Sequence, residues 1–329
     1  MIITKTPFRI SFGGGGSDIP SFYEKHGGCV LSTSINKYIY ISIHPYFYPH
    51  QTVLKYSKTE IVDDIGQINH PIFNCALNEM GIKGVEITST ADIPSNTGLG
   101  SSSAFTVGLL HTLSCYAGKY NSKTRLAEKA CSIEIEKLGS PIGKQDQYAA
   151  ALGGLNFFKF NKDGAVSCEP VMLSTDTKRE LQRRLMLFYL GTTRPANPIL
   201  QEQQQNMTDE AKVKNLLDMC QLAQEMRITL ENDDLSTFGS ILHESWLLKR
   251  TLASGITNHE IDELYEKGLA AGAKGGKLLG AGGGGFLLFY CERDRQERLC
   301  VALGMRPTQF SFEQDGTSVV YIGDKYWGE

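Results

Sequence analysis

The amino-acid sequence predicts an α+β protein built from two lobes. The chain has 329 residues, and a typical domain has about 100 to 200, so two lobes fit its length. Stretches with strand and helix periodicity alternate in the first half, whereas long helical runs dominate the second. We place the boundary after residue 175, which gives lobes of residues 1–175 and 176–329. No linker rich in proline or serine separates them, so we expect the lobes to pack closely.

Glycine is the outlier in the composition, with 34 residues where average usage is about 7%. The excess gathers in three short stretches, at residues 13–16, 98–100 and 268–285. With only 11 prolines and no G-X-Y repeat, the sequence is neither collagen-like nor of low complexity.

The predicted elements follow from the hydrophobic pattern. Isoleucines alternate with other residues in the strand at residues 29–44. Residues 101–117 are apolar on nearly every side, which predicts a buried helix. In the first lobe we further expect strands at residues 85–94 and 153–160 and a helix at 122–138. In the second we expect strands at 184–191 and 285–291, helices at 209–231, 234–253 and 259–271, and a hairpin at 309–323 turning at Asp315–Gly316.

Composition and charge exclude several classes. The formal net charge is −3, so nothing predicts binding to nucleic acid or to an anionic membrane. No apolar stretch approaches the about 18 residues that span a bilayer, and the N-terminus lacks the apolar segment of a signal peptide. We therefore expect a cytoplasmic protein. The eight cysteines contain no C-x-x-C pair, which argues against disulfides and zinc. No particular oligomeric state is predicted.

The segment PSNTGLGSSSA, residues 94–104, lies between a predicted strand and a buried helix. Free backbone N–H groups at a helix N-terminus bind anions, above all phosphate. A plain serine cap is the simpler explanation of such a helix start, but it does not account for the two glycines. We favour phosphate binding.

Other glycine-rich signatures do not fit. The segment lacks the lysine of a Walker A loop. The one G-x-G-x-x-G, residues 280–285, leads into a strand where a dinucleotide fingerprint needs a helix, which disfavours a nicotinamide-dependent oxidoreductase. H-R-D and D-F-G do not occur, which disfavours a protein kinase.

Two carboxylates stand out by their positions. Glu134 falls on the apolar stripe of the helix at 122–138, and a buried carboxylate needs a cation, a hydrogen-bond donor or a metal. A structural salt bridge and a metal site are equally good explanations of Glu134 alone, and a neighbouring phosphate site favours Mg²⁺. Asp146, in GKQDQ, begins a helical stretch and by itself fits a helix cap.

The chain begins with a strand that carries Arg9 and continues into four glycines and Asp18. A backbone without side chains can curl closely around a polar ligand, and Asp18 can accept hydrogen bonds from hydroxyl groups. A mobile glycine loop with a Ser-Asp cap explains the same residues equally well.

Three segments in this order, PFRISFGGGGSD (residues 7–18), PSNTGLGSSSA (94–104) and KLLGAGGGGF (277–286), resemble the three signature motifs of the GHMP small-molecule kinases. The resemblance covers nearly the whole chain. It implies an N-lobe like domain 2 of ribosomal protein S5 and a C-lobe α/β sandwich of ferredoxin-like type. The opening segment most resembles the sugar branch of the family, especially kinases of D-glycero-D-manno-heptose 7-phosphate, with the fucokinase domain as a neighbour.

The resemblance implies ATP and Mg²⁺ as cofactors, with the metal held by Ser102 and Glu134. Asp146 would be catalytic and take the proton from the acceptor hydroxyl, with Arg9 beside it, since a cation favours the ionised carboxylate. The implied ATP-binding residues are Pro94, Gly98, Leu99, Gly100, Ser101, Ser102, Ser103 and Ala104. The implied acceptor-binding residues are Arg9, Gly15, Gly16, Ser17, Asp18, Asp146, Arg194, Gly282 and Gly283.

The implied reaction is the phosphorylation of the anomeric hydroxyl of a sugar phosphate, above all D-glycero-α-D-manno-heptose 7-phosphate, to the 1,7-bisphosphate. A 7-phosphate needs cationic contacts, for which we expect Arg194, with Lys5, Arg9 and Lys144 as further candidates. The alternatives are a kinase of an unphosphorylated sugar such as fucose, and a catalytically silent ligand-binding protein. The presence of Asp146, Glu134 and Ser102 together argues against the silent protein.

Overall fold

The computed structural model describes residues 1–193 and 195–323. Within them, eight strands form a large sheet of order β11-β1-β2-β5-β3-β4, which β6 and β7 extend from β2. The long strand β2 pairs with β5 through residues 39–45 and with β6 through residues 28–33. The strands are β1 (Ile2–Gly13), β2 (Gly28–Pro45), β3 (Thr52–Lys55), β4 (Thr59–Val62), β5 (Val85–Ala91), β6 (Leu155–Phe160), β7 (Val166–Pro170) and β11 (Ser318–Ile322).

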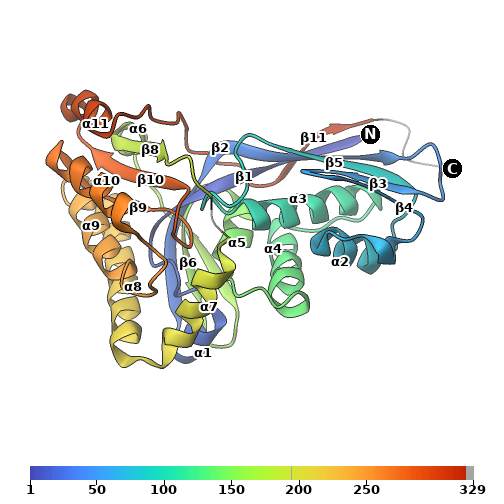
Figure 1. Ribbon diagram of the computed structural model, residues 1–329, viewed down its shortest axis with the longest axis horizontal. Coiled ribbons are helices and arrows are strands. Elements are labelled where there is room, and N and C mark those ends of the chain that lie inside the picture. Colours follow the sequence, from blue (N-terminus) through green and yellow to red (C-terminus); the bar gives the residue numbers. More distant parts are fainter. Residues whose placement is uncertain (194, 324–329) are drawn as a thin grey trace.

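Helices of the first half lie along one side of this sheet (Figure 1). α3 packs against β1 and β2, and α5 packs against α3 and β1. These helices are α1 (Pro20–His26), α2 (Pro71–Met80), α3 (Ser101–Tyr116), α4 (Lys123–Cys131) and α5 (Gln145–Leu152), with a 3₁₀ turn at Ile65–Gln67 and a π-helical segment at Ser132–Lys137.

The second half is built on a three-stranded sheet of order β8-β10-β9, with α8, α9 and α10 beside it (Figure 1). Its strands are β8 (Leu185–Tyr189), β9 (Ala273–Leu278) and β10 (Phe286–Cys291). Its helices are α6 (Thr175–Arg184), α7 (Asn197–Gln205), α8 (Glu210–Glu231), α9 (Phe238–Lys249), α10 (His259–Ala270) and α11 (Gln296–Leu303), with 3₁₀ turns at Asn206–Thr208 and Arg293–Arg295.

The two halves share a hydrophobic core. α8 packs against β1 and β2, and its residues Ala223 and Met226 are buried in the same cluster as the large sheet. Phe12 of β1 meets Phe238 of α9 edge to face, with ring centroids 5.5 Å apart. Close packing of the halves is therefore confirmed, whereas the boundary after residue 175 stays a prediction.

The predicted hairpin at residues 309–323 is wrong. Residues 311 and 313 bond to β2 instead, through Ser311 O to Asn36 N at 2.9 Å and Glu313 N to Ser34 O at 2.9 Å, and β11 pairs with β1. The last strand thus returns to the sheet of the first half. Gly316 does not serve a turn. A glycine is needed there because a Cβ would lie 2.0 Å from the Ala151 carbonyl oxygen. The Asp-Gly pair reflects this close approach.

The predicted helix at 122–138 is present but not uniform. Its last part, Ser132–Lys137, is π-helical, and this wider turn begins just before Glu134. Short elements such as α1, β3 and β4 had no sequence prediction. None of the helices within the described residues has both the length and the apolar character needed to cross a bilayer.

Candidate active site

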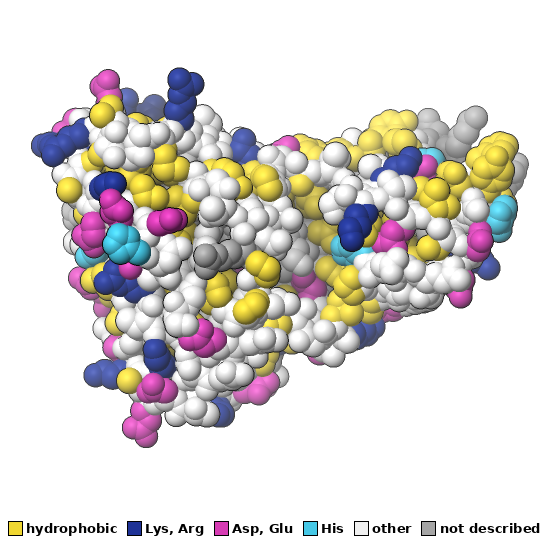
Figure 2. Space-filling view, viewed as in Figure 1, with side chains coloured by type: hydrophobic (Ala, Val, Ile, Leu, Met, Phe, Trp, Pro, Cys, Tyr) yellow, Lys and Arg dark blue, Asp and Glu magenta, His cyan; other side chains and the backbone are white. Residues whose placement is uncertain are grey.

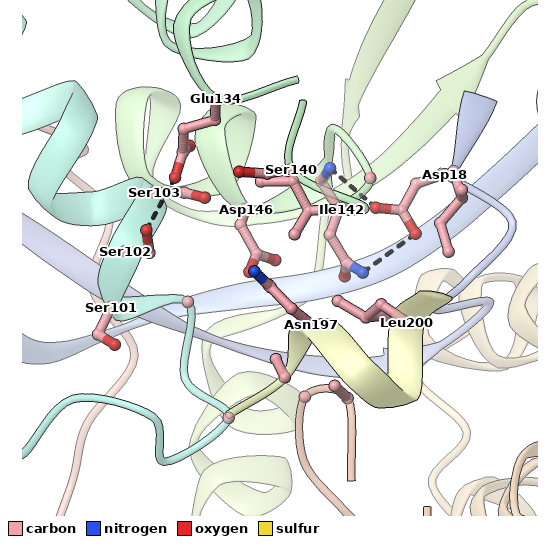
Figure 3. A pocket seen from close by; sticks show the side chains of 18 of the residues that line it. Asp18, Ser101, Ser102, Ser103, Glu134, Ser140, Ile142, Asp146, Asn197 and Leu200 are labelled. Carbon is pink, nitrogen blue, oxygen red and sulfur yellow. Dashed lines mark hydrogen bonds between the residues drawn. The ribbon is translucent and has the colours of Figure 1, made fainter. Parts of the chain in front are cut away.

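A pocket of about 550 Å³ lies where the two halves meet. Its walls come from β1, the start of α3, the π-helical segment, α5, α7 and the loop after β9 (Figure 3). Ten predicted site residues line it: Arg9, Gly16, Asp18, Gly98, Gly100, Ser101, Ser102, Ser103, Glu134 and Asp146. On the face shown in Figure 2, basic and acidic side chains are interspersed.

The start of α3 presents backbone donors to the pocket. Within the described residues its N-cap, Gly100, provides no side-chain cap, so the N–H groups of the first turn can serve an anion. Gly100 has φ +76°, a left-handed conformation that favours glycine. Gly98, at φ +82°, leaves room for the Leu279 carbonyl oxygen, which would lie 2.3 Å from a Cβ.

Glu134 is buried, with 2% of its surface exposed. It accepts a hydrogen bond from Ser102 Oγ at 2.9 Å (Figure 3) and another from Gln147 Nε2 at 2.8 Å. Burial raises the pKa of Glu134, and the bonds from Gln147 and Ser102 offset part of that rise. Among the described residues no cation pairs with it, so the salt-bridge explanation loses its support. A carboxylate and a hydroxyl beside a helix start that is predicted to bind phosphate fit Mg²⁺.

Asp146 stands in the first turn of α5 and forms a two-pronged ion pair with Arg9 of β1. Arg9 Nε donates to Oδ1 at 2.7 Å and Nη2 to Oδ2 at 2.8 Å. Arg9 is 4% exposed and also donates from Nη1 to the Gly98 carbonyl at 2.5 Å. The pair therefore joins the carboxylate to the glycine-rich loop before α3, and places Asp146 beside the predicted phosphate site.

Asp18 is buried. Among the residues labelled in Figure 3, it lies at the opposite end from Ser101. Its Oδ1 accepts from Gly16 N at 2.9 Å and Gln145 Nε2 at 3.2 Å, and its Oδ2 accepts from Gln145 N at 3.1 Å. Burial raises the pKa of Asp18, as does the charge of Asp146. Most of its accepting capacity thus holds the glycine loop and Gln145 in place.

Seven other predicted residues do not line the pocket: Gly15, Ser17, Pro94, Leu99, Ala104, Gly282 and Gly283. Ser17 is buried, and its hydroxyl donates to the Cys29 carbonyl at 2.9 Å. Leu99 and Ala104 belong to the hydrophobic core. Gly282 and Gly283 pack against Ile256, and Gly283 N donates to its carbonyl at 2.9 Å. Here the glycines serve contact within the second half.

Of the cations expected for a substrate phosphate, Arg9 lines the pocket, whereas Lys5 and Lys144 lie elsewhere. Lys5 stacks on Tyr38, 4.7 Å from the ring centre, and Lys144 donates to the Gly164 carbonyl at 2.8 Å. Neither lines the pocket. Arg194 lies outside the described residues.

Two lysines that had no sequence prediction do line the pocket. Lys249 is the last residue of α9, and Lys277 lies in β9. The sequence held a signal for Lys249, since it continues the helical stripe of buried Leu242 and Trp246 as Glu134 does in its own helix. Asn197 and Leu200 of α7 also point into the pocket (Figure 3).

A helix start without a side-chain cap, a carboxylate with a neighbouring hydroxyl, and an Arg-Asp pair are features expected of a phosphoryl-transfer site. Family models described as the GHMP kinases N terminal domain and the GHMP kinases C terminal match residues 69–154 and 226–304. The chain belongs to the GHMP kinase family. This confirms the family and the kinase class that the sequence motifs suggested.

Relatives in both sequence and structure span most of the chain. A D-glycero-alpha-D-manno-heptose 7-phosphate kinase from Campylobacter jejuni is 29% identical over 96% of this chain and 97% of its own. A bifunctional fucokinase/GDP-fucose pyrophosphorylase from Arabidopsis thaliana is 26% identical over 87% of this chain, which spans 29% of that protein. The crystal structure of a D-glycero-D-manno-heptose 1-phosphate kinase from Bacteroides thetaiotaomicron superposes with a TM-score of 0.81 at 24% identity, over 98% of this chain and 100% of the other. The last likeness confirms the two-lobe fold of the family.

Proposed function

We propose that the protein transfers the γ-phosphoryl group of ATP to the anomeric hydroxyl of a sugar phosphate, with D-glycero-α-D-manno-heptose 7-phosphate as the substrate. The observation that carries the proposal is the ion pair of Arg9 and Asp146 beside the open N-terminus of α3. The heptose is supported by the Campylobacter jejuni kinase, whose likeness extends over 96% of this chain.

The nucleotide phosphates would lie against the N–H groups of Ser101, Ser102 and Ser103 at the start of α3. Ser102 Oγ and Glu134 would hold Mg²⁺, which neutralises charge on the phosphate oxygens when it is bound. Gln147 keeps the Glu134 carboxylate oriented toward Ser102 through its bond at 2.8 Å.

In the transfer, the acceptor oxygen forms a bond to the γ-phosphorus while the bond from that phosphorus to the β–γ bridging oxygen breaks. ADP leaves, and the hydroxyl proton passes to an Asp146 oxygen or to water. An anomeric hydroxyl is more acidic than an ordinary alcohol, so orientation by Asp146 can matter as much as proton removal. Arg9 fixes the direction of the carboxylate through its two hydrogen bonds.

The test is ADP release over a panel of sugars and sugar phosphates, followed by ³¹P NMR of the product. We expect turnover with the heptose 7-phosphate and a new anomeric phosphate signal. Equal or faster turnover with free fucose would favour the alternative that the fucokinase relative suggests. No ADP release with any sugar would contradict the proposal.

A further inference from the structure

Lys249 and Lys277 are two buried cations that the proposed chemistry does not yet use. They are 7% and 2% exposed. Lys249 Nζ donates to the Gly280 carbonyl at 2.8 Å, and Lys277 Nζ donates to the Phe12 carbonyl at 3.0 Å. Within the described residues neither forms an ion pair, although unpaired buried charges are costly and rare.

Each ammonium group has three N–H donors, and one carbonyl satisfies a single donor. Burial, together with the charge of Arg9, lowers the pKa of Lys249 to about 8, and the charges of Asp18 and Asp146 oppose this shift. Burial and the charges of Lys249 and Arg9 lower the pKa of Lys277 well below its usual value. Both lysines line the same pocket, where their like charges repel each other, and an anion between them would relieve that repulsion.

Two more polar groups at this end of the pocket lack partners. Gln203 of α7 is 2% exposed, and its Nε2 has no hydrogen-bond acceptor among the described residues. The Oγ of Ser11, in β1, is also buried without a partner there. Both residues line the pocket.

Three of these residues, Ser11, Gln203 and Lys249, lie beside the glycine loop. A Cβ on Gly15 would lie 3.6 Å from Lys249 Nζ and 3.5 Å from Ser11 Oγ, and a Cβ on Gly16 would lie 2.2 Å from Gln203 Nε2. The backbone of residues 15–16 is therefore flanked by unused donors from β1, α7 and α9. Among the described residues these donors outnumber the unpaired acceptor beside them, Gln145 Oε1, and they match an anion with several oxygens, such as phosphate.

We propose that Lys249, Lys277, Gln203 and Ser11 form a second anion-binding position, which holds the phosphate group already carried by the acceptor substrate. This inference rests on the proposed function. The nucleotide phosphates have their own donors in the first half, at the start of α3, whereas the lysines come from the second half beside the glycine loop. The position explains how a sugar kinase would select a phosphorylated sugar.

The first experiment is binding of inorganic phosphate, measured by calorimetry with the nucleotide site saturated by Mg²⁺ and a non-hydrolysable ATP analogue. We expect Lys249→Met and Lys277→Met each to weaken phosphate binding by about tenfold to a hundredfold. Gln203→Leu removes only a neutral donor, and we expect about a fivefold loss. Lys5→Met, which removes a lysine far from the pocket, is the matched control. Unchanged phosphate binding in both lysine variants would overturn the inference.

The second experiment compares kcat/KM for heptose 7-phosphate and for the dephosphorylated heptose. Loss of kcat/KM in Lys249→Met for the phosphorylated sugar alone supports the position. An equal loss for both sugars, or a raised KM for ATP, would assign the lysines to the transferred phosphoryl group or to folding, and overturn it. If the wild-type protein phosphorylates no heptose but binds inorganic phosphate through these lysines, the proposed substrate fails while the anion position stands.

Discussion

The substitution Asp146→Asn tests the proposed chemistry most directly. An asparagine has nearly the same shape, but its amide nitrogen would face one of the two Arg9 N–H groups that now donate to the carboxylate. One of these bonds is lost, and a guanidinium that is 4% exposed keeps no counter-charge. Breaking a buried ion pair costs about 3 to 5 kcal/mol. Because the Asp146 side chain is 24% exposed and Arg9 retains the Gly98 carbonyl, we expect about 2 to 3 kcal/mol of lost stability.

The effect on turnover is larger than the effect on stability. Loss of proton acceptance and of hydroxyl orientation at Asp146 predicts a decrease in kcat of about 10²- to 10⁴-fold. The KM for ATP should stay within about threefold, since the donors of α3 are untouched. Coupled ADP release gives both constants, and thermal unfolding gives the stability. Asp163→Asn, a change of an exposed aspartate, is the matched control. A kcat within tenfold of wild type, or a KM for ATP that rises in step with the loss, would refute the reasoning.

The remaining predictions concern the metal, the loop and pH. Glu134→Gln should raise the Mg²⁺ concentration for half-maximal activity by about tenfold or more, and an unchanged titration would return Glu134 to a structural role. Gly100→Ala should cost about 1 to 2 kcal/mol of backbone strain and also lower kcat, because its Cβ would lie 3.2 Å from an Asp146 oxygen. Gly139→Ala, at φ +62° in open space, should show the strain in a thermal unfolding scan without the loss of activity. Because burial lowers the pKa of Lys249 to about 8, this side chain is charged below that pH and neutral above it. The KM for the sugar phosphate should therefore rise as pH passes through 8, and a KM constant from pH 7 to 9 would contradict this.

Long periodic segments were predictable because their signal is repeated many times. The apolar helix expected at 101–117 is α3, Ser101–Tyr116, and the strand expected at 29–44 is β2, Gly28–Pro45. The burial of Glu134 was predictable because this charged residue falls on the apolar stripe of its helix. The same reasoning applies to Lys249, which ends the stripe of α9, but a lysine at a helix end equally well reaches solvent.

Contacts between distant segments left no such signal. Lys277 sits in an ordinary buried strand, and only the fold places its ammonium group on the carbonyl of Phe12 in β1. The Asp-Gly pair at Asp315–Gly316 has the sequence of a hairpin turn, yet α5 packs against Gly316 and β1 takes up the strand that follows. Pairing of the last strand with β1 thus outweighed the local preference of Asp-Gly for a turn.

Two of the glycine-rich stretches, at residues 98–100 and 268–285, contact each other where the two halves of the chain meet. A Cβ on Gly280 would lie 2.4 Å from the Gly98 Cα, and one on Gly285 would lie 2.2 Å from the Thr97 carbonyl oxygen. The loop before α3 and the loop after β9 thus touch backbone to backbone, with no side chains between them. Arg9 binds the Gly98 carbonyl and Lys249 binds the Gly280 carbonyl, so each buried cation is anchored to one side of this contact. Any side chain at Gly98 or Gly280 would separate the two anchors, and with them the proposed nucleotide and acceptor positions that they serve.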